Sequence, residues 1–371
     1  MKLAILEPNL STSVGHYWDD AKILIRHLQQ RGHTVELHGN RSLDAALLDE
    51  ADRQAIPITP TFRIPHNWFW QGDKPNEADY RNAAAFTAAD LAQIHDCDLL
   101  FWPTIEPSAL LACTMQAEPT PTICGVHFTP GLFRPAGPVI WRQATRAIAQ
   151  HAMSHIKFGV YHASVRASLC TYSPELNLHA LPSMYFGTGR PRGAGAVQRI
   201  GFFGHQRPER GSSIVPDLVQ LLLERGFHVT LQDSSGQFSV RGQIERLTVL
   251  PYVEDIAAAM GACDLIIWPS RYETYTERSS GIISQCIAGG IPFIAPSGCA
   301  PSQEAAELGT GTFFHAYSVA AIAEALDEAV ADFPALVARA NRAAAQWGLT
   351  NGPDLLARWL EVQCCSWDLG G

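Results

Sequence analysis

The sequence predicts an α/β protein made of two Rossmann-like, doubly wound domains that face each other across a cleft. Apolar, strand-like runs alternate with segments of helical period along most of the chain, which is typical of parallel sheets covered by helices. This alternation lapses in LPSMYFGTGRPRGAGAVQ, residues 181–198, where Gly, Pro and Arg cluster. With 371 residues, 47% of them hydrophobic, the chain is long enough to build two cores.

The first domain is expected over residues 1–190. KLAILEP, YWDDAKILIRHLQQRG and HTVELHG indicate a strand, a helix ended by Gly32 and a second strand. Further strands are predicted in DLLFWPT and TPTICGVHF, and a helix in VIWRQATRAIAQ. The Pro- and aromatic-rich stretch at 58–80, ITPTFRIPHNWFWQGDKPNEADY, shows no clear period, so we predict a loop excursion there.

The second domain is expected over residues 197–350. Its predicted strands are RIGFFG, HVTLQD, RLTVLPY, DLIIWPS, IPFIAPS and GTGTFFH, and its predicted helices are IVPDLVQLLLERG, VEDIAAAMGAC, GIISQCIAGG and a segment from about Ser318. The tail at 351–371 predicts one more amphipathic helix, which we expect to return to the first domain. Open α/β sheets bind ligands at the carboxyl ends of their strands, so the residues that follow strands are the candidates for a site.

Charge and cysteine content exclude several classes of protein. A formal net charge of -9 and a sequence pI near 5.8 argue against a nucleic-acid binder, which would present a basic face. Nine cysteines without a CxxC pair suggest neither a zinc site nor a disulfide framework. MKLAILEPN lacks the pattern of a signal peptide and no run is long enough to span a bilayer, so we expect a cytoplasmic protein and leave peripheral membrane contact open.

Two loops of the second domain predict anion binding. In GFFGHQRPERGSS, residues 201–213, Gly204 forms a turn and Arg207 and Arg210 arrive just before a helix. Cations beside free helix amides suit a phosphate or diphosphate, although a solvated polar loop is the alternative. In RYETYTERSSGIISQCIAGGIPFIAP, residues 271–296, Ser280 can cap a helix and Gly281 allows close approach of a ligand.

A carboxylate beside the predicted helix start at Ser280 indicates that the ligand also contains hydroxyl groups. Glu277 precedes the helix start, where it would repel a bare phosphate but accept hydrogen bonds from hydroxyl groups. Hydroxyl groups and phosphate together indicate a sugar nucleotide as the ligand.

The block LTVLPYVEDIAAAMGACDLIIWPSRYETYTERSSGIISQCIAGGIPFIAP resembles the donor-binding half of retaining GT-B glycosyltransferases of the family 4 type, also called glycosyltransferase group 1. That group shows a Glu, seven residues, a second Glu, a helix of small residues ending in Gly, and a strand led by Pro. Counting back from Gly290 places the first Glu on Glu277 and the second on Gln285. Counting forward from the Ser of WPS would instead choose Glu273, and that alternative stays open.

The resemblance implies roles for particular residues. The first Glu of the motif lies near the donor sugar, and the second holds the ribose of the nucleotide; Gln285 keeps a carbonyl oxygen for that role, but a Gln satisfied by backbone groups is the alternative. Arg207 and Arg210 would neutralise the diphosphate together with the backbone of Gly15, Ser280 and Gly281, while His205 replaces an Arg often found after the strand. The implied nucleotide contacts are Gln285, Gly204, His205 and Ile282.

In the first domain the resemblance places His127, at the end of TPTICGVHF, against the donor sugar as a second catalytic residue beside Glu277. His16 would line the acceptor side, and Trp68 and Trp70 would offer a stacking platform, although three adjacent aromatics also suit a packed excursion. The implied reaction moves a sugar from a nucleoside diphosphate sugar to a hydroxyl of a carbohydrate, lipid-linked or small-molecule acceptor with retention of configuration. It implies no metal and no cofactor besides the donor.

Three alternatives to this reaction stay open. A nucleotide-sugar 2-epimerase shares the two-domain plan and binds a similar donor. A degenerate relative would bind a sugar nucleotide or a partner without turnover. Gln285 and His205 leave this alternative open, because they replace residues that are common in the family motif. A binding protein of two hinged α/β domains is the third, but such proteins are usually exported.

Overall fold

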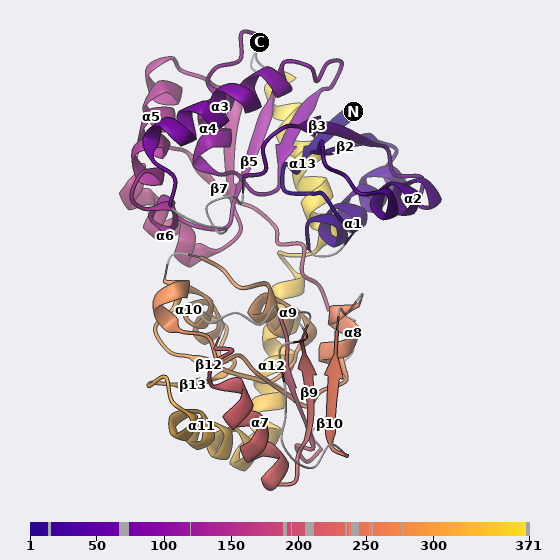
Figure 1. The fold of residues 1–371 in the computed structure, drawn as a ribbon, viewed down its shortest axis with the longest axis vertical. Coiled ribbons are helices and arrows are strands. Elements are labelled where there is room, and N and C mark those ends of the chain that lie inside the picture. The colour runs from indigo at the N-terminus through magenta and orange to yellow at the C-terminus, as the bar shows by residue number, and fades with distance from the viewer. Residues whose placement is uncertain are drawn as a thin grey trace. The chain divides into compact units, whose positions relative to one another are not determined.

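A computed structural model describes the chain up to Asp368, apart from residues 14–15, 67–73, 119, 188–190, 194, 205–210, 234–235, 237, 239–244, 252, 254 and 277. The chain divides into two compact units (Figure 1). Unit 1 comprises Met1–Met184 with Gly352–Gly371, and unit 2 comprises Tyr185–Asn351. Each unit is built on one parallel sheet, which confirms the predicted α/β class.

Unit 1 contains a sheet of seven parallel strands in the order β3-β2-β1-β4-β5-β6-β7. The strands are β1 (Lys2–Leu6), β2 (Thr34–Asn40), β3 (Ile58–Phe62), β4 (Leu99–Trp102), β5 (Thr122–Val126), β6 (Ile156–Val160) and β7 (Leu178–Ala180). The helices are α1 (His16–Gln30), α2 (Ala45–Arg53), α3 (Glu77–Leu91), α4 (Pro107–Cys113), the 3-10 helix η2 (Pro130–Phe133), α5 (Gly137–Gln150), α6 (Ala163–Tyr172) and α13 (Pro353–Asp368).

The central strand β1 shows why this sheet is buried on both faces. Ala4 and Leu6 pack into one hydrophobic core, and Leu3 and Ile5 pack into a second core on the opposite face. Successive side chains of a strand point to opposite faces, so a strand covered by helices on both sides becomes a continuous apolar run.

The excursion predicted over residues 58–80 is wrong at both ends, since α3 already begins at Glu77. Ile58–Phe62 forms β3, which pairs with β2 at the edge of the sheet, and Pro60 lies opposite Gly39 in the register. Proline has no N–H to donate and is tolerated at a sheet edge, where one side of the strand has no partner strand. Trp68 and Trp70 lie outside the described residues.

The C-terminal helix α13 packs against α1 within unit 1 (Figure 1). Its residues Leu356, Ala357 and Leu360 enter the core that contains Leu3 and Ile5. On the surface of the same contact, Nη2 of Arg31 lies 2.6 Å from Oε2 of Glu361. The apolar stripe and this ion pair together hold the end of the chain on the unit that contains its beginning.

Unit 2 contains a sheet of six parallel strands in the order β10-β9-β8-β11-β12-β13. The strands are β8 (Arg199–Phe202), β9 (His228–Gln232), β10 (Leu247–Leu250), β11 (Leu265–Ile267), β12 (Phe293–Pro296) and β13 (Thr312–Phe314). The helices are α7 (Val215–Glu224), α8 (Ile256–Gly261), the 3-10 helix η4 (Tyr272–Tyr275), α9 (Gly281–Gly289), α10 (Ala300–Glu307), α11 (Val319–Ala331) and α12 (Phe333–Gly348). Again a central strand feeds two cores, with Leu265 and Ile267 on one face and Ile266 on the other.

Among the described helices of both units, none combines the length and the apolar character that crossing a bilayer requires.

Candidate active site

The start of α9 has the geometry of a capped helix end. Ser280 has extended backbone angles, with φ −134° and ψ 116°, and its Oγ accepts a hydrogen bond from the amide of Ile283 at 3.5 Å. Gly290 ends the helix with φ 61°, the left-handed conformation that favours glycine. The first amides of such a helix carry partial positive charge, so this end can bind an anion if a ligand reaches it.

The segment at residues 185–187 lies along one face of α9. A Cβ added at Gly281 would lie 2.3 Å from Oη of Tyr185, and one added at Gly187 would lie 2.1 Å from the carbonyl oxygen of Ala288. The indole of Trp347 fixes the same segment by donating to the carbonyl oxygen of Tyr185 at 2.9 Å. Gly281 was predicted to allow close approach of a ligand. In this structure its lack of a side chain leaves room for the phenol of Tyr185.

Gln285 takes part in the same contact. Its side chain is 7% exposed, and Nε2 donates to the carbonyl oxygen of Phe186 at 3.2 Å. Within the described part of the chain its Oε1 accepts no hydrogen bond. The two ends of the amide can therefore act separately. Nε2 holds residues 185–187 in place, and Oε1 can accept a hydrogen bond from a hydroxyl group. A glutamate could not donate in this way when ionised.

The predicted phosphate loop is anchored at both ends by glycines with positive φ. Gly204 has φ 97° and donates its amide to Oε1 of Gln232, at the end of β9, at 2.8 Å. Gly211 has φ 87°, and a Cβ there would lie 2.0 Å from the carbonyl oxygen of Pro269. The glycines that flank the predicted phosphate loop therefore lie against the end of β9 and the segment that follows β11. The predicted residues within it lie outside the described part of the chain: His205, Arg207 and Arg210.

The acidic loop before α9 contains residues that sequence reasoning missed. Glu277 lies outside the described residues, whereas Glu273 is exposed on η4. Arg278, directly after Glu277, is buried and its Cζ lies 4.1 Å from the ring centroid of Tyr275. Ser270 is fully buried at the end of the β11 loop, and its Oγ forms no hydrogen bond with any described residue. Ser270 and Arg278 could have been found from the sequence, because they lie on either side of the acidic motif.

In unit 1, His127 directly follows β5 and stacks on Tyr161, with ring centroids 3.9 Å apart and planes 10° apart. Tyr161 is fixed by donating its hydroxyl to the carbonyl oxygen of Pro103 at 3.1 Å. Burial, followed by the nearby charges of His162 and His16, holds the pKa of His127 well below its usual range. His127 is therefore neutral at neutral pH and can exchange hydrogen bonds with sugar hydroxyls.

His16 begins α1 at the same edge of the sheet, where it is exposed and lies against Tyr17 with ring centroids 4.1 Å apart. Its electrostatic coupling to His127 shows that the structure brings these two predicted residues into one region. Gly15, which precedes His16, lies outside the described residues. Ile282, on α9 in unit 2, is half-buried against the core of that unit.

Buried carboxyl groups follow two strands of unit 1 and were also missed. Glu7 comes directly after β1 and Glu106 precedes α4, and both are at most 5% exposed. Burial raises the pKa of Glu7 well above its usual range, with a smaller contribution from Asp20. Burial and then Glu7 raise the pKa of Glu106, which Asn9 opposes by a hydrogen bond. Burial followed by Asp19 raises the pKa of Asp20 to about 7.

Across the described part of both units, no three His, Cys, Asp or Glu side chains come together as metal ligands.

The chain matches no family model and no curated protein sequence. Its fold is similar to solved structures over nearly its whole length. The Anabaena protein HepE in complex with UDP and glucose matches with TM-score 0.68 and 15% identity, covering 99% of this chain and 100% of that one. Sucrose-phosphate synthase from Thermosynechococcus elongatus matches with TM-score 0.66 and 12% identity over 100% of each chain.

A glycosyltransferase from Rickettsia africae matches with TM-score 0.65 and 14% identity, covering 98% of this chain and 97% of that one. The two parallel-sheet units are therefore those of the GT-B fold found in glycosyltransferases. At this level of identity the likeness establishes the fold, and the reaction has to be argued from the site.

Proposed function

We propose that this chain is a glycosyltransferase that moves a sugar from a nucleoside diphosphate sugar to an acceptor hydroxyl, with retention of the anomeric configuration. The observation that carries the proposal is the likeness of the entire chain to HepE, a protein whose structure contains UDP and glucose. The capped start of α9 supports it, because the first amides of a helix suit a diphosphate, and Gly204 and Gly211, both with positive φ, flank the predicted phosphate loop. We expect the enzyme to act in the cytoplasm and to require no metal.

Unit 2 would hold the donor. Arg207 and Arg210 would neutralise the diphosphate, and the amides at the start of α9 would stabilise the charge that develops as this group departs. Glu277 would act on the donor sugar as positive charge grows at its anomeric carbon. Oε1 of Gln285 would accept a hydrogen bond from a ribose hydroxyl while Nε2 keeps its contact with Phe186.

Unit 1 would serve the acceptor, with His127 also contacting the donor sugar. Its depressed pKa supports a neutral hydrogen-bonding role, because an imidazolium would oppose the positive charge of the transition state. A leaving phosphate oxygen would take the proton of the acceptor hydroxyl, so the balance of the step needs no additional base. The acceptor hydroxyl oxygen forms the new glycosidic bond as the bond to the diphosphate breaks.

A second candidate is a GT-B protein that binds a sugar nucleotide or a partner without turnover. The hydrogen bond from Gln285 to Phe186 favours it, since a motif carboxylate has been replaced by an amide whose nitrogen has a structural role. In that case nucleotides would bind but no donor would be consumed.

Nucleotide release from UDP-, GDP-, ADP- and TDP-sugars, incubated without acceptor, tests the proposal. We expect slow hydrolysis of one donor, lost in Glu277→Gln and Arg210→Ala. Glu273→Gln is the matched control, because it removes the other acid of the same loop. If Glu273→Gln abolishes release and Glu277→Gln does not, the assignment of the motif is wrong. Binding of a nucleotide without release from any donor would support the second candidate.

A further inference from the structure

We propose that the acceptor carries an oxyanion, a phosphate or a carboxylate, that binds to the exposed guanidinium groups of Arg41 and Arg63 in unit 1. This inference rests on the proposed transfer function, because an acceptor presupposes transfer. Arg41 directly follows β2, and Arg63 directly follows β3. Both therefore lie at the carboxyl edge of the sheet, where open α/β sheets bind ligands.

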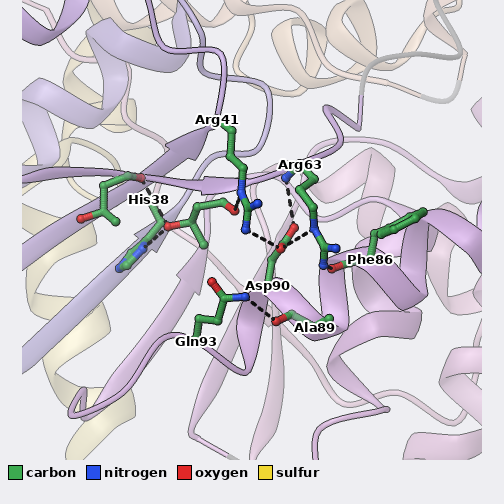
Figure 2. A network of polar contacts seen from close by, with 9 residues as sticks. His38, Arg41, Arg63, Phe86, Ala89, Asp90 and Gln93 are labelled. Carbon is green, nitrogen blue, oxygen red and sulfur yellow. Dashed lines mark hydrogen bonds and ion pairs between the residues drawn. The ribbon is translucent and has the colours of Figure 1, made fainter.

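The two guanidinium groups are brought side by side by one buried carboxylate (Figure 2). Oδ1 of Asp90 accepts from Nη2 of Arg41 at 3.3 Å and from Nε of Arg63 at 2.7 Å. Oδ2 of Asp90 accepts from the backbone amide of Arg63 at 3.0 Å. Because both guanidinium groups contact a single oxygen atom, they lie close together.

Other contacts fix the orientation of each arginine. Nε of Arg41 donates to the carbonyl oxygen of Thr61 at 3.0 Å. Nη2 of Arg63 donates to the carbonyl oxygen of Phe86 at 2.9 Å, and its Cζ lies 4.9 Å from the ring centroid of Phe86 (Figure 2). Ordering these long side chains is completed when the protein folds, so a ligand would not bear that entropic cost.

The charges of this cluster do not balance. Two arginines face one carboxylate, which is 1% exposed, while the side chains of Arg41 and Arg63 are 46% and 33% exposed. Within the described part of the chain, Nη1 of each arginine donates no hydrogen bond. The cluster therefore presents one surplus positive charge and two oriented Nη1 groups to its surroundings, and a cation with N–H donors suits a phosphate or carboxylate group.

Hydrogen bonds join the segments that contain Arg41 and Arg63 to the loop that follows β1. The amide of Asn40 donates to the carbonyl oxygen of Leu10 at 2.9 Å. The amide of His66 donates to Oδ1 of Asn9 at 2.7 Å. Residues 9–10 belong to the loop that leads to His16, which is expected to line the acceptor side. The arginine pair is thus part of the same edge as the expected acceptor region.

The test compares acceptors that differ in charge, using the complete chain and the donor it hydrolyses. The acceptors are glucose 6-phosphate, glucuronate and glucose. We expect Arg41→Gln to raise the KM for the two anionic acceptors by roughly 10- to 100-fold, the effect of losing charge-assisted hydrogen bonds, and to leave transfer to glucose unchanged. Arg41 is chosen because Arg63 remains to pair with Asp90, and Arg41→Lys should recover only part of the loss.

Arg81→Gln is the matched control, because Arg81 lies on α3, the helix of Asp90, and its side chain is 47% exposed in an ion pair with Glu77. It should change none of these values. Equal losses for anionic and neutral acceptors in Arg41→Gln, or no loss at all, would overturn the inference.

A second measurement separates this inference from the proposed function. Titration with inorganic phosphate, followed by the Nε–Hε NMR signals of arginine, should shift the signal of Arg63 in the native chain and not in Arg41→Gln, even if no donor is consumed. Absence of a saturable shift would overturn the inference while leaving donor hydrolysis intact. Sedimentation with phosphatidylinositol vesicles but not phosphatidylcholine vesicles, lost in Arg41→Gln, would support the oxyanion site and place the phosphate on a lipid headgroup.

Discussion

Replacement of Gln285 by glutamate should destabilise unit 2 in a manner that depends on pH, although the substitution restores the residue type expected of the motif. The side chain is 7% exposed, and its Nε2 donates to the carbonyl oxygen of Phe186 at 3.2 Å. In Gln285→Glu an ionised oxygen would face that carbonyl oxygen in a buried setting. The lost hydrogen bond and the buried charge together cost roughly 2–4 kcal/mol at pH 8.

The pH dependence follows from the proton that the variant can bind. Burial and the facing carbonyl raise the folded-state pKa of the introduced carboxyl group above its unfolded value. The protonated acid can donate to Phe186, so the loss at pH 5 shrinks to about 1 kcal/mol. The loss grows as pH rises from the unfolded value, about 4.3, to the raised pKa. Thermal unfolding should show the transition of unit 2 lowered by about 5–10 °C at pH 8.

Two variants control this experiment. Gln285→Met removes the donor without adding a charge, so it should cost about 1 kcal/mol at both pH values. Gln346→Glu adds a charge at an exposed position of α12 and should cost almost nothing at either. If Gln285→Glu loses the same stability at pH 5 and pH 8, or loses none, the hydrogen bond to Phe186 does not have the role described.

Three further predictions concern stability, measured by urea or thermal unfolding. Glu7→Gln should stabilise unit 1 by roughly 1–3 kcal/mol at pH 8 and by little near pH 4, because burial makes the folded state hold the proton of Glu7 and ionisation costs stability as pH rises; a gain that is independent of pH would contradict this. Glu361→Gln should cost about 1–2 kcal/mol at pH 7. The cost should fade as pH falls from about 4.5 toward 2, because the hydrogen bond from Arg31 lowers the pKa of Glu361 to about 2. Gly211→Ala should cost roughly 3 kcal/mol or more, from strain at φ 87° and overlap with the carbonyl oxygen of Pro269, whereas Gly309→Ala, at φ 67° with open space, should cost about 1 kcal/mol; equal costs would show that the overlap is relieved.

The alternation of apolar runs and helical segments predicted the two parallel sheets, because that pattern reflects burial of strands on both faces. It failed at β3, where Thr alternates with Ile58, Pro60 and Phe62 and only the tertiary position at the sheet edge makes Pro60 acceptable. The cap at Ser280 and the glycine end of α9 could be predicted since both depend on neighbouring residues in the chain.

The contacts that define the site at α9 could not be predicted in the same way. Gln285 and Phe186 are 99 positions apart, and no local pattern states which backbone carbonyl a buried amide will meet. The motif count placed Gln285 on the correct helix, but only packing shows that Nε2 is engaged while Oε1 is available. The same holds for Arg41, Arg63 and Asp90, which the fold of β2, β3 and α3 brings together.

Glu7 is a different case, because the signal was present in the sequence. An acidic residue directly after an apolar strand lies at the ligand-binding edge of a parallel sheet, where burial raises its pKa. The strand pattern by itself predicts only structure and assigns no role to the carboxyl group at its end.

The configuration of the sugar released from the donor tests the proposed function most directly. One-dimensional proton NMR, begun within minutes of mixing the chain with UDP-α-glucose or whichever donor is hydrolysed, identifies the anomer formed before mutarotation. Retention predicts that α-glucose appears first and that Glu277→Gln abolishes its formation. First appearance of β-glucose would contradict a retaining reaction, and release of no sugar from any donor would contradict a glycosyltransferase.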